Sequence, residues 1–526
     1  MTAINRRDTL RLTAGAIAAA CLVPARAMAA GDAPVVATRH GRVRGYRDNG
    51  VSVFKGVRYG ADTAPRRFRP PVAPAPWDEV AEATAYGPAC LQGSETGEQS
   101  EDCLFLNVWT PAAGDGRKRP VLFYIHGGAY SNGSGSSPWY DGRELARRGD
   151  VVVVTVNHRL NAFGYLYLRR FADDRFPDSG NCGQLDLVLA LRWIRGNIEA
   201  FGGDPDCVLA FGQSGGGAKI ATMMAMPAAR GLFHRAASMS GQQVTVSGPG
   251  NATLRALTFL DAVGVAPHAA ACLAEMPAER LLAGLSAPDP VLGRGAVYFG
   301  PVLDMRSLDR HPFYPDAAPQ SVDIPMIIGN THDETRAFLS GDEYYGLEWN
   351  ELPELLPQNL PVDIRPEFVI EEYRRLYPEL SPTDVFFRAT TAGRSWRAAI
   401  VEAEERARAG RRNTYVYQLD FGSPVEPHLG APHTFDIPLV FGTLDAPDSI
   451  TGTGRESRQV AAMLGDAFVN FARNGVPSAD TLPEWRPYTL PQRETMVIDV
   501  APRMENDPRG AERKLFARVP YVQPGT

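Results

Sequence analysis

The segment VLAFGQSGGG, residues 208–217, decides the fold of this chain. It opens with an apolar run that suits a buried strand, and a helical pattern follows it. Its centre is a Gly-x-Ser-x-Gly pattern, whose small residues permit the strained turn that lifts a serine hydroxyl above a sheet. The pattern alone is weak because serine and glycine are common in turns. Its place between strand and helix favours Ser214 as a nucleophile over a plain turn serine.

Two further apolar runs precede this segment, PVLFYI at 120–125 and VVVVTV at 151–156. Continuous runs of this kind are typical of parallel strands that are buried on both faces. Ahead of residue 208, one helical face carries Leu187, Leu191, Ile194, Ile198 and Phe201. Gly202 then provides a helix stop. Strand, helix and strand at this spacing predict a βαβ unit.

The rest of the chain extends the same pattern. Residues 35–60 alternate like a hairpin, 324–330 and 414–419 are strand candidates, and 363–409 have helical periodicity. No repeat, low-complexity tract or linker divides the sequence. We therefore predict one α/β domain over residues 30–526, with a mostly parallel central sheet flanked by helices.

The composition is that of a globular protein with a sizeable core. Of the 526 residues, 44% are hydrophobic and 22% are charged, which excludes a disordered chain. The formal charge is −6 and no lysine or arginine cluster offers phosphates a footprint, so nucleic acid is not an expected partner. No group of histidine, cysteine and carboxylate residues has the spacing of metal ligands, so we expect no metal or organic cofactor.

Residues 1–29 are typical of a twin-arginine export signal. They contain Arg6 and Arg7, an apolar stretch at 12–24 and a small-residue end at 27–29. The apolar stretch is shorter than the about 20 residues that a membrane span needs, and no later segment comes closer. An ordinary secretory signal and a lipid-attached Cys21 are the alternatives. We expect a periplasmic or secreted protein without a membrane span.

A serine alone is a poor nucleophile, so an acid and a histidine should follow it along the chain in that order. His433 lies in a loop rich in glycine and proline just after the last strand candidate. His428 shares this loop and is the competing histidine. Asp333 and Glu334 follow the strand candidate at 324–330, where the acid is expected. Spacing alone does not decide between these two carboxylates.

The tetrahedral intermediate of an acyl transfer needs hydrogen-bond donors for its oxyanion. His126, Gly127 and Gly128 directly follow the strand candidate at 120–125. The backbone amides of Gly127 and Gly128 would join that of Gly215 in an oxyanion hole. The alternative is a simple glycine turn beside a packed His126.

Five cysteines remain once the signal is removed. Cys90 and Cys103 are close in sequence, and a bridge between them in an oxidising compartment would contribute about 3 kcal/mol of stability. Cys182, Cys207 and Cys272 have no such obvious partner. We expect them to be small buried hydrophobes.

These motifs together resemble the type B carboxylesterase family, which includes bacterial para-nitrobenzyl-type esterases, fungal lipases and cholinesterases. The resemblance extends from about residue 35 to 500. Its most specific element is EDCLFLNVWTP at 101–111, which matches the second signature of the family. Supporting matches are Gly56-Val57-Arg58-Tyr59-Gly60, Arg67-Phe68 before Pro70-Pro71, Asn157-His158-Arg159, Ser240-Gly241, and Trp485 with Pro487 and Tyr488.

The resemblance implies an α/β-hydrolase fold in which helical insertions form a cap over the active-site gorge. It also implies a disulfide between Cys90 and Cys103, and a catalytic triad of Ser214, Glu334 and His433. The expected activity is hydrolysis of a small-molecule carboxylic ester through an acyl-enzyme on Ser214.

Three residues depart from the family pattern. Gln213 replaces a glutamate and so removes a buried negative charge beside the nucleophile, which should weaken any preference for cationic substrates. Gly215 replaces an alanine and is expected to keep the oxyanion amide but loosen the turn. Thr335 replaces the glycine that commonly follows the acid.

The sequence says less about the substrate. The loop between Cys90 and Cys103 contains no aromatic residue to stack on a quaternary ammonium, so choline esters are poor candidates. Tyr130, Trp139 and Tyr140 are candidates either to line the pocket or to pack in the core. Rival functions are a non-catalytic binding protein, an interfacial lipase, and an amidase or carbamate-cleaving enzyme with the same residues.

Overall fold

The computed structural model of the chain describes residues 33–93 and 97–526. The predicted export signal at residues 1–29, with Arg6, Arg7 and Cys21, lies outside the described residues.

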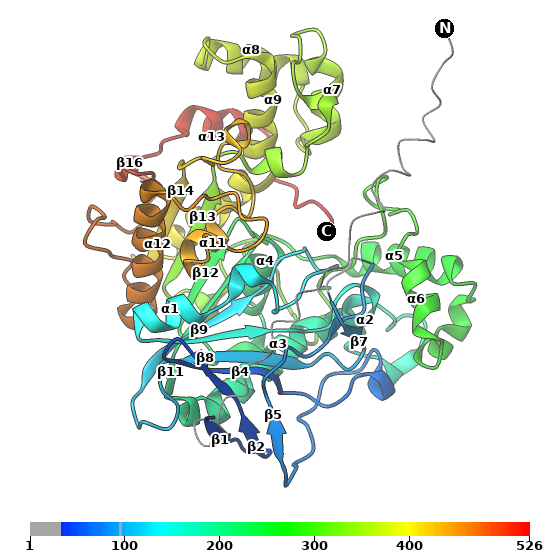
Figure 1. The fold of residues 1–526 in the computed structure, drawn as a ribbon. Helices are drawn as coiled ribbons and strands as arrows, with labels where there is room; N and C mark the ends of the chain where they lie inside the picture. The colour runs from blue at the N-terminus through cyan, green and yellow to red at the C-terminus, as the bar shows by residue number, and fades with distance from the viewer. Residues whose placement is uncertain (1–32, 94–96) are drawn as a thin grey trace, which may run out of the picture. The chain divides into compact units, whose positions relative to one another are not determined.

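An eleven-stranded sheet runs through residues 34–526 (Figure 1). Its strands lie in the order β16-β15-β14-β13-β12-β11-β9-β10-β8-β4-β3. The strands from β10 to β15 are parallel, and antiparallel strands complete both edges. Their bounds are β3 Tyr46–Asp48, β4 Val51–Arg58, β8 Phe105–Thr110, β9 Arg119–Ile125, β10 Val152–Val156, β11 Gly203–Gln213, β12 Arg235–Met239, β13 Met326–Thr331, β14 Thr414–Leu419, β15 Glu494–Ile498 and β16 Arg503–Asn506.

Two small sheets lie outside the central one. The first contains β1 (Val35–Ala37), β2 (Arg42–Arg44) and β5 (Val80–Glu82). The second pairs β6 (Ala89–Cys90) with β7 (Gln99–Ser100).

The predicted parallel sheet is confirmed. Val121 of β9 pairs in parallel with Val152 of β10 on one side and with Val208 of β11 on the other. The antiparallel pair β3 and β4 is the hairpin expected within residues 35–60. β11 begins earlier than its apolar run, at Gly203, because this residue also pairs with β9 across an irregular register.

Helices cover both faces of the sheet, because successive residues of each strand point to opposite sides. On one face, Val153 of β10, Leu122 of β9 and Leu209 of β11 share an apolar core with α1 (Arg143–Gly149), α11 (Asp436–Phe441) and α12 (Arg455–Asn474). On the other face, Val152 and Val154 belong to a core that includes α3 (Cys182–Asn197), α4 (Gly215–Met223) and α10 (Arg397–Arg408). These two apolar cores hold the strand ends that carry the site.

A separate helical lobe is inserted after β13, and its helices stand together in Figure 1. It contains α7 (Leu352–Asn359), α8 (Pro366–Leu376) and α9 (Pro382–Thr391), which share an apolar core with α13 (Gly510–Phe516). A single π-helical turn, Ala392–Trp396, joins α9 to α10. The remaining helices are α2 (Asn161–Tyr165), α5 (Pro249–Ala262) and α6 (Ala278–Gly284).

Buried Glu512 on α13 ties the lobe together. It accepts hydrogen bonds from Tyr373 and Tyr377, and it forms ion pairs with Arg388 and Arg509. Burial alone would raise the pKa of the Glu512 carboxyl, but the two guanidinium groups outweigh it and lower that pKa to about 2.

No single helix within the described residues combines the length and the apolar character that crossing a membrane requires. α5 and the 3-10 segment Pro267–Ala274 reach that length and apolar character only when taken together, and a bend of 74° separates them.

The described cysteines differ from expectation at three points. Cys90 and Cys103 are free buried thiols, so the expected disulfide is not formed in this structure. The neighbouring Cys90 side chain, together with burial, raises the pKa of the Cys103 thiol. Cys182 is buried as predicted. Cys207 is only partly buried, because it lies near the start of β11, where its Sγ contacts Ala472 O and the Arg235 guanidinium. Cys272 is exposed because its 3-10 segment turns that side chain toward solvent.

Candidate active site

Ser214 occupies the tight turn between β11 and α4. Its backbone has φ 55° and ψ −126°, a conformation that is strained for any residue except glycine. Its amide donates to Met239 O at 2.8 Å. The chain around it is packed so closely that a Cβ on Gly216 would lie 1.9 Å from Ile125 O. The surrounding glycines therefore allow the turn that raises Ser214 above the sheet.

The glycine loop after β9 meets this turn. A Cβ placed on Gly127 would lie 3.2 Å from the Cβ of Ser214, and one on Gly215 would lie 2.0 Å from Ala129 O. Gly128 has a φ of 79°, which favours glycine. Gly215 lets the glycine loop approach the serine more closely than an alanine would permit. The looser turn expected from this glycine stays a prediction.

Glu334 and His433 meet beside this turn. Glu334 begins a 3-10 turn just after β13, and His433 lies in the loop between β14 and α11. Both side chains are buried, and Nδ1 of His433 is hydrogen-bonded to Oε2 of Glu334. The other carboxylate oxygen of Glu334 accepts from the Thr331 amide at 3.0 Å. Burial disfavours the charged carboxyl, but His433 outweighs it and holds the pKa of Glu334 below its ordinary value.

Asp333 and His428, the alternative acid and histidine that spacing left open, form no hydrogen bond or ion pair with each other or with His433 within the described residues. Asp333 braces the histidine loop, because its Oδ2 accepts from the Ala431 amide at 3.0 Å and its own amide donates to Ala431 O at 2.9 Å. It also pairs with His332 at 3.1 Å. His428 is exposed and lies 3.5 Å from Glu426. Glu334 and His433 are thus the acid and histidine that the structure brings together.

Gln213 makes a contact that sequence reasoning missed. Its side-chain Nε2 lies 3.1 Å from Nε2 of His433 and 3.4 Å from Nδ1. Among the described residues, the Ser214 side chain forms no hydrogen bond to this imidazole. The Gln213 amide therefore occupies the nitrogen to which a serine proton would be transferred. Its position next to the nucleophile was visible in the sequence, but the direction of its side chain was not.

Two buried basic residues, Lys219 and His126, lie behind the glycine loop. Lys219 Nζ donates to the carbonyl of His126 at 3.2 Å and lies 5.6 Å from the ring centroid of Tyr130. No carboxylate in the described part of the chain forms an ion pair with it, and burial lowers the pKa of Lys219 to about 7. Burial, followed by the charge of Lys219, lowers the pKa of His126 to about 3. Lys219 thus anchors the backbone from which Gly127 and Gly128 extend.

A cavity of about 230 Å³ opens onto Ser214 and Gly215. Tyr130 lines it, but Trp139 and Tyr140 do not. These two are packing residues: Trp139 donates to Pro447 O at 2.8 Å, and Tyr140 packs on Tyr124 and Phe441. The other lining residues come from segments that lie far apart in the sequence, namely Ala129, Ala218, 240–243, Leu292, Tyr298, 394–395, Ala398, Tyr521 and 523–525.

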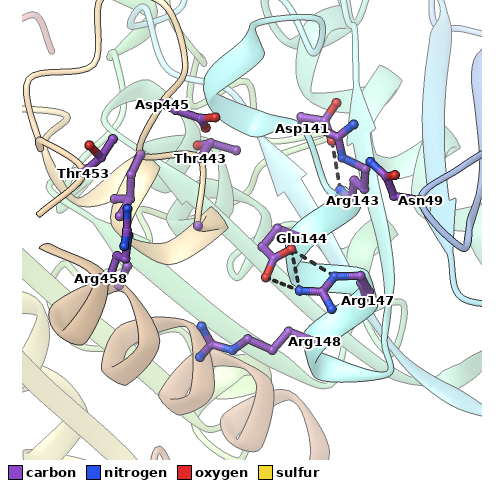
Figure 2. Close-up of a pocket in the computed structure, with 13 residues that line it drawn as sticks. Asn49, Asp141, Arg143, Glu144, Arg147, Arg148, Thr443, Asp445, Thr453 and Arg458 are labelled. Carbon is purple, nitrogen blue, oxygen red and sulfur yellow. Dashed lines mark hydrogen bonds and ion pairs between the residues drawn. The ribbon is translucent and has the colours of Figure 1, made fainter. Parts of the chain in front are cut away.

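A larger surface cavity of about 560 Å³ lies elsewhere, between α1 and α12 (Figure 2). Three of its arginines are already paired with carboxylates, Arg143 with Asp48, Arg147 with Glu144 and Arg148 with Asp466. Its described lining contains no serine, cysteine or histidine. It therefore contains none of the residues predicted to carry out ester hydrolysis.

In the part of the chain that the structure describes, no group of three or more histidine, cysteine or carboxylate side chains is arranged to hold a metal ion.

Comparison with known proteins shows relatives that match nearly the whole chain. The model of the carboxylesterase family matches residues 32–516. The para-nitrobenzyl esterase of Bacillus subtilis is 35% identical over 502 residues, which cover 92% of this chain and 98% of that protein. The phenmedipham hydrolase of Pseudarthrobacter oxydans is 32% identical over 500 residues, covering 88% and 95%. The crystal structure of the Geobacillus stearothermophilus carboxylesterase EST55 superposes with a TM-score of 0.82, at 40% identity and covering 92% and 99% of the two chains.

Proposed function

The chain belongs to the carboxylesterase family, whose type B members hydrolyse carboxylic ester bonds, and on this basis we propose that it cleaves esters through an acyl-enzyme on Ser214. The observation that carries the proposal is the hydrogen bond between His433 Nδ1 and Glu334 beside the strained turn of Ser214. Glu334, His433 and Ser214 supply the acid, the base and the nucleophile that acyl transfer requires.

The first half of the reaction begins when the Gln213 amide leaves His433 Nε2. The Ser214 hydroxyl then attacks the ester carbonyl while His433 Nε2 accepts its proton. Glu334 holds the imidazole tautomer through Nδ1 and stabilises the imidazolium that forms. The amides of Gly127, Gly128 and Gly215 face the oxyanion of the tetrahedral intermediate. His433 finally protonates the departing alcohol.

The second half repeats these roles with water. His433 takes a proton from a water molecule, which attacks the acyl-enzyme carbonyl, and then returns that proton to Ser214 Oγ as the acid leaves. Lys219 supports both halves from behind, because its hydrogen bond to the His126 carbonyl fixes the start of the glycine loop.

The direct test is Ser214→Ala, with hydrolysis of a chromogenic butyrate ester as the readout. The rate constant should fall by at least about 10⁴-fold, since removal of a serine nucleophile eliminates the covalent route. Exposed Ser286→Ala is the control and should retain wild-type turnover. Near-wild-type activity in Ser214→Ala would refute the acyl-enzyme. Absence of labelling by a fluorophosphonate in the folded wild type would favour the non-catalytic binding function.

We also propose that residues 1–29 export the enzyme and that 30–526 form the mature domain. The support is the arginine pair and the short apolar stretch of the sequence. In a cell fractionation experiment with the full chain, Arg6→Lys combined with Arg7→Lys should shift the esterase from the periplasm or medium to the cytoplasm. Unchanged export of the double variant would contradict a twin-arginine route.

A further inference from the structure

One charged side chain in the cavity has no partner. Arg394 is the only charged residue that lines the cavity at Ser214, so far as the chain is described. Its guanidinium forms no hydrogen bond or ion pair within the described residues. It stacks on Phe338, 3.8 Å from the ring centroid, and Phe338 in turn packs on the His433 ring at 4.8 Å. The unpaired cation is thus separated from the catalytic imidazole by one aromatic ring.

An irregular helical turn places the Arg394 side chain at the cavity. Arg394 lies in the single π-helical turn between α9 and α10. Such a turn contains an extra residue, which shifts the register of the helix, and such turns are frequent at functional sites. Arg394, Ser395 and Ala398 consequently all line the cavity.

No nearby group in the described structure neutralises Arg394. Glu334 contributes a favourable charge, but its two oxygens are engaged by His433, Asn330 and Thr331. Burial raises the pKa of Glu402 to about 8, so this carboxyl behind the cavity is largely uncharged at pH 7.

The rest of the described cavity lining is polar but carries no other charge. Gln242, Gln243 and Gln523 line it together with Ser240 and Ser395. The lining tyrosines are uncharged, since burial raises the pKa of Tyr130, Tyr298 and Tyr521. Arg394 is partly buried and has no counter-charge, so a bound anion would supply the partner that its guanidinium lacks.

We propose that Arg394 binds a carboxylate of the substrate, so that the enzyme prefers esters that carry a free carboxylate group beside the scissile bond. The planar guanidinium can donate two parallel hydrogen bonds to such a group. Half-esters of dicarboxylic acids and acylated hydroxy acids are substrates of this class. The inference rests on the proposed acyl-enzyme at Ser214 and assigns the substrate class of that same site.

The test uses matched ester pairs that differ in one charge. Monoethyl and diethyl glutarate place the carboxylate on the acyl side, and 4-acetoxybenzoate and its methyl ester place it on the alcohol side. The quantity measured is the ratio of kcat/KM for the anionic ester to kcat/KM for its neutral partner. Arg394→Met should lower this ratio by about 10- to 100-fold in at least one pair, since a charge-assisted hydrogen bond is lost. Arg394→Lys should give an intermediate ratio, because lysine keeps the charge but not the planar fork.

Arg374→Met is the matched control. Arg374 also stacks on an aromatic ring, 4.5 Å from the centroid of Trp349, but it is exposed in the helical lobe and does not line the cavity. Its substitution should leave the ratio unchanged. The same ratio in wild type and Arg394→Met for both pairs would overturn the assignment while leaving ester hydrolysis intact.

A wild-type measurement covers the case in which Arg394→Met fails to fold. Ser214 would bind the boron of aryl boronic acids reversibly, so 4-carboxyphenylboronic acid is compared with its methyl ester as an inhibitor. Tighter inhibition by the carboxylate, weakened by added salt, supports the proposal. Equal inhibition by both overturns it. Inhibition by neither, together with no turnover of any ester, counts against the acyl-enzyme itself.

Discussion

Gln213 Nε2 lies 3.1 Å from His433 Nε2, so the residue before the nucleophile, and not the nucleophile itself, is hydrogen-bonded to the candidate base. His433 Nδ1 is held by Glu334 at the same time, and both ring nitrogens are therefore engaged. This places the free enzyme in a resting arrangement in which the proton path from Ser214 is interrupted. Activation requires the Gln213 amide to turn away, at the cost of about one hydrogen bond.

Removal of that amide should speed up the first chemical step. Gln213→Leu keeps the approximate size of the side chain but has no donor, so His433 Nε2 becomes free to accept the serine proton. We expect the second-order rate of fluorophosphonate labelling to rise by about 2- to 10-fold, the equivalent of one net hydrogen bond. A fall in the labelling rate would show that Gln213 orients His433 and does not obstruct it. Gln459→Leu, which removes a contact to Val500 O elsewhere, is the control and should not change the rate.

The acid can be identified by comparing two neighbouring substitutions. Glu334→Gln leaves the shape of the site but removes the charge that fixes the His433 tautomer, so kcat should fall by about 10³- to 10⁴-fold. Asp333→Asn removes a brace of the histidine loop and should mainly lower thermal stability. Steady-state kinetics and a melting curve on both variants separate these effects. A larger loss of kcat in Asp333→Asn than in Glu334→Gln would reverse the assignment.

Gly215→Ala tests why the nucleophile turn contains an unusual glycine. The added Cβ would lie 2.0 Å from Ala129 O and 2.5 Å from Ala129 Cα, and these are backbone atoms that cannot rotate away. The glycine loop must therefore move, and the oxyanion donors at Gly127 and Gly128 move with it. We expect kcat/KM to fall by about 10²-fold, the typical effect of one lost oxyanion donor. Wild-type kinetics in this variant would show that the loop adapts without cost.

The sequence predicts the strands and the nucleophile turn, which depend on local patterns. It does not predict contacts that depend on the direction of a side chain. Continuous apolar runs and glycine spacing are local, which is why β9, β10, β11 and the turn at Ser214 were predictable. The choice between Asp333 and Glu334 needed the family pattern, because adjacent carboxylates at a strand end look alike in one sequence. Arg394 gave no sequence signal, because it reaches the cavity only through a π-helical turn.

Residue type alone did not predict whether Trp139, Tyr140 and Cys272 lie in the core, in the pocket or at the surface. Trp139 and Tyr140 were equally compatible with pocket and core until their partners on α11 and in the following loop were known. Cys272 is apolar in character but exposed, because the short segment that carries it buries only Ala270 and Leu273. Such positions are decided by tertiary packing and not by periodicity.

The buried carboxylate of Glu512 should make the helical lobe sensitive to acid. Its pKa is about 2 in the folded protein against an ordinary value of 4.5, so it binds a proton less readily when folded than when unfolded. A carboxyl with a lowered pKa contributes stability that is complete above about pH 4.5 and is lost as the pH falls toward 2. The full contribution is about 3 kcal/mol. Glu512→Gln removes it and also leaves buried Arg509 and half-buried Arg388 without their counter-charge.

Urea unfolding of wild type and Glu512→Gln at pH 7, 4 and 3 measures this contribution. The variant should be less stable at pH 7 by several kcal/mol, since breaking a buried ion pair leaves unpaired charge. The gap should narrow as the pH falls, because the wild-type carboxylate is then titrated in the unfolded state. Glu372→Gln breaks an ion pair with Arg375 on the solvent face of α8 and should change stability little at any pH. A gap for Glu512→Gln that stays constant from pH 7 to 3 would mean that the pKa of this carboxyl is the same in the folded and unfolded states, which contradicts a pKa lowered by Arg388 and Arg509.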